Sequence, residues 1–136
     1  MKLHFIGETN EVMKGLTELE GVLDFALTDE GVAVAVEKAE RGLSISCEVI
    51  EGKANYRITY SRLPEFFRAF SILLDAVKNG KTDINVKETA AFETCGISID
   101  LSRNAVLKVS TFQDVVRRIA LMGFYYISMR KGFNKV

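Results

Sequence analysis

The sequence predicts an α+β fold in which an antiparallel-rich sheet is covered by helices and is followed by one strand–helix–strand unit. Apolar and polar residues alternate through residues 22–60, and apolar residues recur at helical spacing through residues 63–79. A third observation sets the last part of the chain apart. A strand, a helix and another strand follow one another after residue 93, an order that requires parallel strands joined by a right-handed crossover.

The composition fits a globular chain and excludes several classes of function. Of the 136 residues, 48% are apolar and 26% are charged, and the formal net charge is zero. A nucleic-acid-binding domain usually concentrates its bases on one surface, whereas the bases here are dispersed, so we expect no nucleic-acid partner. Because there is no apolar run of 18 residues and no signal peptide, we also expect no membrane association and a cytoplasmic location.

The first 20 residues predict a strand and a helix. The strand covers residues 2–6, and Thr9 or Asn10 is placed to cap the helix that follows. Gly15 inside this helix costs about 1 kcal/mol relative to alanine, so the helix depends on packing. Its apolar positions have helical spacing: Val12, Met13, Leu16 and Leu19.

Alternation with a period of two predicts two hairpins. In the first, residues 23–28 pair with residues 32–36 around a turn at residues 29–31. In the second, which is the clearer of the two, residues 43–49 pair with residues 54–60 around a turn at 51–52. In both hairpins one face is apolar and the other is polar, which is typical of an antiparallel sheet with one solvated face.

A helix over residues 63–79 is expected to cover the sheet. Pro64 suits its first turn, Asn79 with Gly80 supplies its end, and Glu65 falls on its polar side. Its apolar face is broad: Leu63, Phe66, Phe67, Phe70, Leu73, Leu74 and Val77. We interpret the phenylalanines as core rather than as a ligand-binding aromatic box, because their spacing is that of a helix lying on a sheet.

The candidate site residues follow the next strands. After a short strand at residues 84–88, a strand at residues 96–101 leads into a polar turn, so that Asp100, Arg103 and Asn104 lie together at its end. The carboxyl end of such a strand is where α/β folds present ligand-binding groups.

The helix after this turn is predicted to begin at a capping box formed by Ser110 and Gln113. Its inner face is apolar: Phe112, Val115, Val116, Ile119 and Met122. Gly123 ends the helix, and residues 124–129 read as a buried strand.

The residues themselves indicate no catalytic, metal-binding or cofactor-binding constellation. The sole histidine, His4, lies in the first predicted strand. Cys47 and Cys95 lie in strand-like apolar contexts, and we expect both to be buried free thiols. We therefore assign no catalytic residue, no metal ligand and no cofactor.

The stretch 95–106, Cys-Gly-Ile-Ser-Ile-Asp-Leu-Ser-Arg-Asn-Ala-Val, followed by Ala-Leu-Met-Gly at 120–123, resembles the opening of the catalytic barrel in family 20 glycoside hydrolases, the β-N-acetylhexosaminidases. It is most similar to a bacterial subgroup of that family. The Leu-Pro-x-Phe-Phe-Arg-Ala helix at 63–69 and the strands before it resemble the family's small α/β domain. The resemblance implies a non-catalytic N-terminal domain at residues 1–92 and the truncated start of a (β/α)8 barrel, an incomplete TIM barrel, at residues 93–136.

The resemblance also implies a chemistry, the substrate-assisted hydrolysis of terminal N-acetylhexosamine residues, in which an Asp–Glu pair acts after the fourth barrel strand. The only adjacent Asp–Glu in this sequence is at 29–30, in a predicted turn, so we expect the chain to be inactive by itself. Cys95 stands where many members carry a sugar-gripping arginine. Asp100, Arg103 and Asn104 are then sugar-pocket or barrel-mouth residues, and we favour Asp100 and Arg103 as a pair that braces the strand end.

Two functions follow from these readings. The chain is the N-terminal domain or a truncated remnant of a hexosaminidase-like hydrolase, or it is a stand-alone carbohydrate- or protein-binding module. An N-acetylhexosamine-containing glycan is the partner implied for the full-length family. Because two barrel strands cannot close, we expect the last unit to dock on the first domain or to form a homodimer through its unpaired strands.

Overall fold

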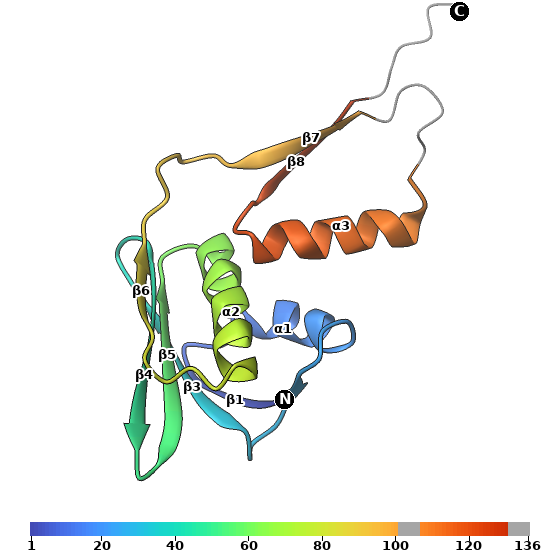
Figure 1. Ribbon diagram of the computed structural model, residues 1–136. Helices are drawn as coiled ribbons and strands as arrows, with labels where there is room; N and C mark the ends of the chain where they lie inside the picture. Colours follow the sequence, from blue (N-terminus) through green and yellow to red (C-terminus); the bar gives the residue numbers. More distant parts are fainter. Residues whose placement is uncertain (101–106, 131–136) are drawn as a thin grey trace, which may run out of the picture.

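The computed structural model describes residues 1–100 and 107–130 of the chain. Its first part contains β1 (Lys2–Gly7), α1 (Met13–Glu20), β2 (Ala26–Leu27), β3 (Val32–Lys38), β4 (Leu43–Ile50), β5 (Lys53–Tyr60), α2 (Leu63–Lys78) and β6 (Asn85–Glu88). The second part contains β7 (Gly96–Asp100), α3 (Val109–Leu121) and β8 (Tyr126–Arg130). The α+β class is confirmed, with α1 and α2 on one face of a six-stranded sheet and a separate two-stranded sheet beside α3 (Figure 1).

The large sheet is mixed and has the strand order β2-β1-β3-β5-β4-β6. β4 pairs antiparallel with β5 and β6, whereas β1 pairs in parallel with β2 and β3, and β3 pairs in parallel with β5. The predicted hairpin of β4 and β5 is confirmed, with Ile50 opposite Lys53. Its two turn residues, Glu51 and Gly52, both have positive φ, as a tight two-residue hairpin turn requires.

The first predicted hairpin is wrong, because β1 lies between its two strands. Both β2 and β3 pair in parallel with β1, at Leu3↔Leu27 and Leu3↔Val32 respectively. The chain therefore passes from one side of β1 to the other between residues 28 and 31. Gly31 makes this crossing, and a Cβ placed there would lie 2.6 Å from the backbone nitrogen of Leu3. The strand predicted over residues 32–36 is confirmed in β3, whereas the one predicted over residues 23–28 is reduced to Ala26–Leu27. Alternation also carries no information about which strand is the neighbour.

α1 contributes its predicted apolar face to the core, with Val12, Leu16 and Leu19 buried. The predicted cap is wrong, because Val12 is the residue before the helix and no side chain caps it. Gly15 has a packing role that the sequence did not reveal. A Cβ at Gly15 would lie 2.3 Å from the Phe67 ring of α2, so the glycine lets the two helices approach.

α2 forms the centre of the core, as predicted. Phe66 and Phe70 are fully buried, and their rings stack with centroids 6.3 Å apart. Tyr60 of β5 meets Phe66 edge to face at 5.3 Å, which confirms the reading of these aromatics as core. Leu63 departs from its expected place, since it is 41% exposed and lies in the first turn of the helix.

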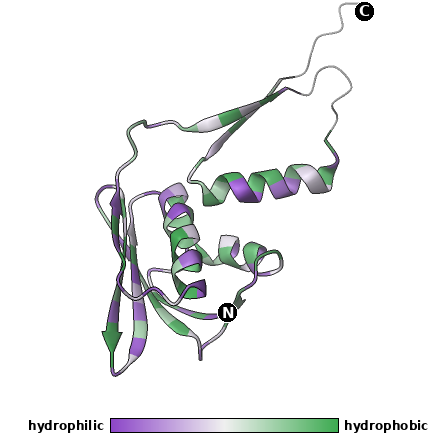
Figure 2. Cartoon of the chain, in the orientation of Figure 1, coloured by the Kyte–Doolittle hydropathy of each residue, from purple (hydrophilic) through white to green (hydrophobic). Residues whose placement is uncertain are grey.

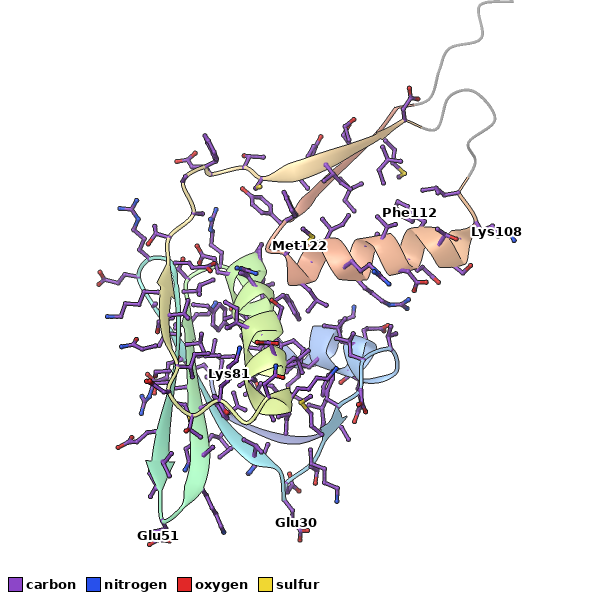
Figure 3. The ribbon with its side chains drawn as sticks, in the orientation of Figure 1. Glu30, Glu51, Lys81, Lys108, Phe112 and Met122 are labelled. Carbon is purple, nitrogen blue, oxygen red and sulfur yellow. The ribbon has the colours of Figure 1, made fainter. Side chains whose placement is uncertain are left out.

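β7 and β8 pair in parallel, with Gly96 opposite Tyr126 and Asp100 opposite Arg130. The predicted capping box is wrong: Lys108 precedes α3, and Ser110 lies inside the helix without capping it. Figure 2 shows both hydrophobic and hydrophilic residues along α3. Phe112 and Met122 lie on its side toward β7 and β8 (Figure 3), and Ile119 is its one buried residue within the described part of the chain.

β8 is shorter and more exposed than the buried strand that the sequence predicts. It begins at Tyr126, and both Tyr126 and Met129 are 56% exposed. The exposure of Tyr126 fits the arrangement of this part, because α3 covers one side of the two-stranded sheet while the opposite side has no covering layer among the described residues (Figure 1). No helix in residues 1–100 and 107–130 combines the length and the hydrophobicity needed to cross a membrane.

Candidate functional site at the junction of the two sheets

The structure places one of the three predicted site residues. Asp100 is the last residue of β7, and it is exposed at the end of the strand that lies away from the large sheet (Figure 1). Arg103 and Asn104 lie outside the described residues, and so does the predicted pairing of Asp100 with Arg103. The position of Asp100 at a carboxyl strand end therefore agrees with the sequence reading, while its role stays a prediction.

The strand that carries Asp100 has one polar face. Gly96, Ser98 and Asp100 are exposed, whereas Ile97 and Ile99 between them are half-buried. Gly96 allows β8 to approach closely, since a Cβ there would lie 2.3 Å from the carbonyl oxygen of Tyr126. The glycine of the Cys-Gly pair is thus required by the pairing of the two strands.

A second site, which the sequence did not reveal, lies where α2, the segment before β7 and the turn after α3 meet. A hollow of about 210 Å³ opens there, and its walls include Arg62, Arg68, Glu88, Phe92, Cys95 and Tyr125. Gly123 closes one side: it has φ of +85°, and a Cβ there would lie 3.2 Å from the Cβ of Arg68. A left-handed residue without a side chain therefore lets the end of α3 rest on α2.

Glu65 lies at the base of the hollow at this junction. It is only 8% exposed, and its carboxylate accepts hydrogen bonds from the Ser61 hydroxyl at 2.6 Å and from the Arg62 backbone N–H at 2.9 Å. The sequence reading that put Glu65 on the solvated side of the helix is wrong. The missed signal is its place at the third position after Arg62, where a glutamate reaches back to cap a helix.

These hydrogen bonds decide the charge state of Glu65. Burial raises the pKa of the Glu65 carboxyl, but the Ser61 hydroxyl, the backbone N–H groups of Arg62 and Ser61 and the Arg62 guanidinium outweigh burial. The net result is a pKa below the usual value, so Glu65 is ionised at neutral pH.

The arginines around the hollow are paired with carboxylates. Arg68 donates from Nε and Nη2 to the two carboxylate oxygens of Glu88, each at 3.1 Å. Arg62 lies 3.3 Å from the Glu65 carboxylate and donates to the Glu93 carbonyl oxygen at 3.1 Å. The rim therefore has charged groups of both signs and little net charge.

No metal-binding group is assembled by the residues that the structure describes. Across residues 1–100 and 107–130 there is no group of three His, Cys, Asp or Glu side chains that could hold a metal ion. Asp29 and Glu30 lie exposed in the turn before β3. Both cysteines are free, as expected, but Cys95 is exposed and Cys47 is only half-buried, which corrects the prediction that both are buried.

The fold and its junction define a small α+β domain with a second unit docked on its central helix. A family model described as the N-acetyl-β-D-glucosaminidase N-terminal domain matches residues 4–89. These residues run from β1 to just beyond β6 and make up more than half of the chain. The chain belongs to this family of glycosidase N-terminal domains. No curated protein matches the chain.

Proposed function

We propose that residues 1–92 are the non-catalytic N-terminal domain of a family 20 β-N-acetylhexosaminidase-like hydrolase, and that residues 93–136 begin its catalytic (β/α)8 barrel. The family match to residues 4–89 supports the assignment of residues 1–92 as an N-terminal domain. The parallel strand–helix–strand order of β7, α3 and β8 supports the second half, because it is the repeating unit of such a barrel. The barrel-like motif at residues 95–106 adds to it.

In this proposal the N-terminal domain positions the first barrel strands. α3 rests on α2 through Gly123 and the half-buried Leu121, which packs against the core of the large sheet. β7 then points its carboxyl end, with Asp100, away from that domain (Figure 1). Barrel enzymes build their active sites at this end, so Asp100, Arg103 and Asn104 line or brace the mouth that receives an N-acetylhexosamine-containing glycan.

The 136 residues alone are proposed to lack hydrolase activity, because their one adjacent Asp–Glu pair lies at residues 29–30 in a turn of the large sheet's domain. A chromogenic N-acetylglucosaminide incubated with the purified chain is expected to show no turnover above buffer. Turnover above buffer would overturn this part of the proposal, whether or not Asp29→Asn and Glu30→Gln abolish it.

A complementation experiment tests the positive part. A β-N-acetylglucosaminidase barrel lacking its first strand–helix–strand unit is mixed with the chain, and the chain is expected to restore measurable turnover. The matched control is the chain with Gly96→Ala, in which β7 and β8 no longer pair closely. No gain of activity with either chain would contradict the barrel assignment of residues 93–136.

A second function, a protein-binding module, is favoured by one observation. Among the described residues the outer edge of β8 has no strand paired to it, and Met129 is 56% exposed. We propose a second copy of the chain as the occupant of this edge. If the β8 strands of two copies paired antiparallel about Ser128, Ile127 of each copy would lie opposite Met129 of the other. Light scattering is expected to show a dimer that Met129→Lys converts to monomer; a monomeric wild-type chain would exclude this function.

A further inference from the structure

We propose that the hollow at the junction of the two sheets binds a single uncharged sugar ring. The hollow lies on α2, whereas Asp100 lies at the far end of β7, so this site is separate from the proposed barrel mouth (Figure 1). The inference goes beyond the proposed function, since neither a barrel-positioning domain nor a dimer requires a ligand at this junction.

The size and the aromatic walls of the hollow fit one pyranose ring. Its volume of about 210 Å³ is smaller than that of the clefts that take drug-sized ligands, which are about 300–1,000 Å³. Phe92 and Tyr125 both line it, and Phe92 is 74% exposed. Aromatic faces carry partial negative charge, so they attract the polarised C–H bonds on one face of a sugar. Because Arg62 lies over the Tyr125 ring, Phe92 offers the freer surface.

The polar walls favour an uncharged ligand with many hydroxyl groups. Arg68 and Glu88 are already paired with each other through two hydrogen bonds, so a ligand of either charge would have to separate them. The pair engages Nε and Nη2 of the guanidinium, which leaves Nη1 to donate, and carboxylate oxygens accept more than one hydrogen bond. Thr89, which also lines the hollow, adds a hydroxyl that both donates and accepts. Such charge-assisted hydrogen bonds suit sugar hydroxyls.

The test is a titration of the isotope-labelled chain with sugars, followed by amide chemical shifts. Glucose and N-acetylglucosamine are each expected to shift amides at residues 62–68, 88–93 and 123–125. The dissociation constant is expected on the order of 1–10 mM, because a single ring has few atoms to bury. Glucose 6-phosphate is the charged comparison and is expected to bind no more tightly than glucose.

Two variants decide whether the shifts report this site. Phe92→Ala is expected to weaken binding by about fivefold to tenfold, through loss of the aromatic face. Val109→Ala is the matched control, since Val109 has the same 74% exposure and lies on α3 outside the hollow, and it is expected to leave binding unchanged. Superimposable spectra of the unliganded variants establish that the fold is kept.

Three results would overturn the inference. They are an absence of localised shifts with either sugar, an equal affinity for wild-type chain and Phe92→Ala, and shifts confined to the end of β7 near Asp100. The last result would instead support the proposed barrel mouth. Because the readout is binding, its failure is distinguishable from the failure of complementation, which tests the proposed function.

Discussion

The guanidinium carbon of Arg62 lies 5.6 Å from the centre of the Tyr125 ring, directly over its face. Arg62 precedes α2 and Tyr125 precedes β8, so this contact joins the two sheets of the molecule. The same guanidinium contacts the Glu65 carboxylate and the Glu93 carbonyl oxygen. One side chain therefore links the start of the central helix, the connecting segment and the second strand of the smaller sheet.

Replacement of Arg62 by alanine is expected to loosen the second unit and to leave the large sheet intact. The lost cation–π contact and ion pair are each worth about 0.5–1 kcal/mol at a half-exposed position. Amide hydrogen exchange should accelerate at residues 119–130 and stay unchanged in β3 and β5. Arg57→Ala, which removes an arginine paired with Glu37 on the open face of the sheet, is the control and should change neither region.

Glu65→Ala is expected to destabilise the whole first domain. The change removes the hydrogen bonds to the start of α2, a loss of about 1–2 kcal/mol for a helix cap. Urea unfolding at neutral pH measures the difference. Glu18→Ala, on the exposed side of α1, should fall within about 0.5 kcal/mol of the wild-type chain; an equal loss in both variants would contradict the capping role.

The contribution of Glu65 should also depend on pH. Its pKa in the folded chain is lowered from the ordinary value of 4.5, so the folded state binds this proton less readily than the unfolded state does. The stabilisation is therefore present above pH 4.5 and is lost as the pH falls through the folded pKa. The stability gap between the wild-type chain and Glu65→Ala should shrink on acidification from pH 5 to pH 3, and a constant gap would contradict this.

Gly15→Ala tests the close approach of α1 and α2. Helix propensity alone predicts a gain of about 1 kcal/mol, but the new methyl group would overlap the Phe67 ring, which itself packs edge to face on Phe66. Overpacking of this kind costs about 1–3 kcal/mol, so we expect a net loss in thermal unfolding experiments. Gly21→Ala is the matched control, because nothing lies within 4 Å of a Cβ there. Stabilisation by Gly15→Ala would show that the helices can separate freely.

Gly96→Ala is expected to disrupt the pairing of β7 with β8. The added methyl group would meet the backbone of Tyr126, which cannot move without losing the register between the strands. Exchange protection of β8 should fall while that of β5 is kept. Ser98→Ala, two residues along the same exposed face, should preserve both. Unchanged protection of β8 in Gly96→Ala would show that the strands adapt.

Local features of this fold were predictable from the sequence because they depend on neighbours in the chain. The β4–β5 hairpin follows from alternation interrupted by Glu51 and Gly52, and the core position of Phe66 and Phe70 follows from helical spacing. The class of the fold follows from these elements. The position of Asp100 at a strand end also depends only on local pattern.

Features that depend on contacts between distant residues were not predictable in this way. The insertion of β1 between β2 and β3 depends on pairing partners that alternation does not specify. From the sequence alone, Gly15 only lowers the helix propensity of α1; its packing role is evident only from the position of the Phe67 ring beside it. The junction hollow was missed because Arg62, Glu88 and Tyr125 come from three separate segments, and no spacing in the sequence relates them.

The position of β1 between β2 and β3 has a consequence for how the chain is made. β1 precedes its partners in the chain: its longer neighbour, β3, ends at Lys38 and the next strand of the sheet ends at Tyr60. During synthesis β1 therefore lacks its neighbour β3 until the chain has been made beyond Lys38. Since unpaired strand edges are prone to aggregation, any slowing of translation after β1 has emerged from the ribosome and before β3 has emerged is expected to lower the yield of folded chain.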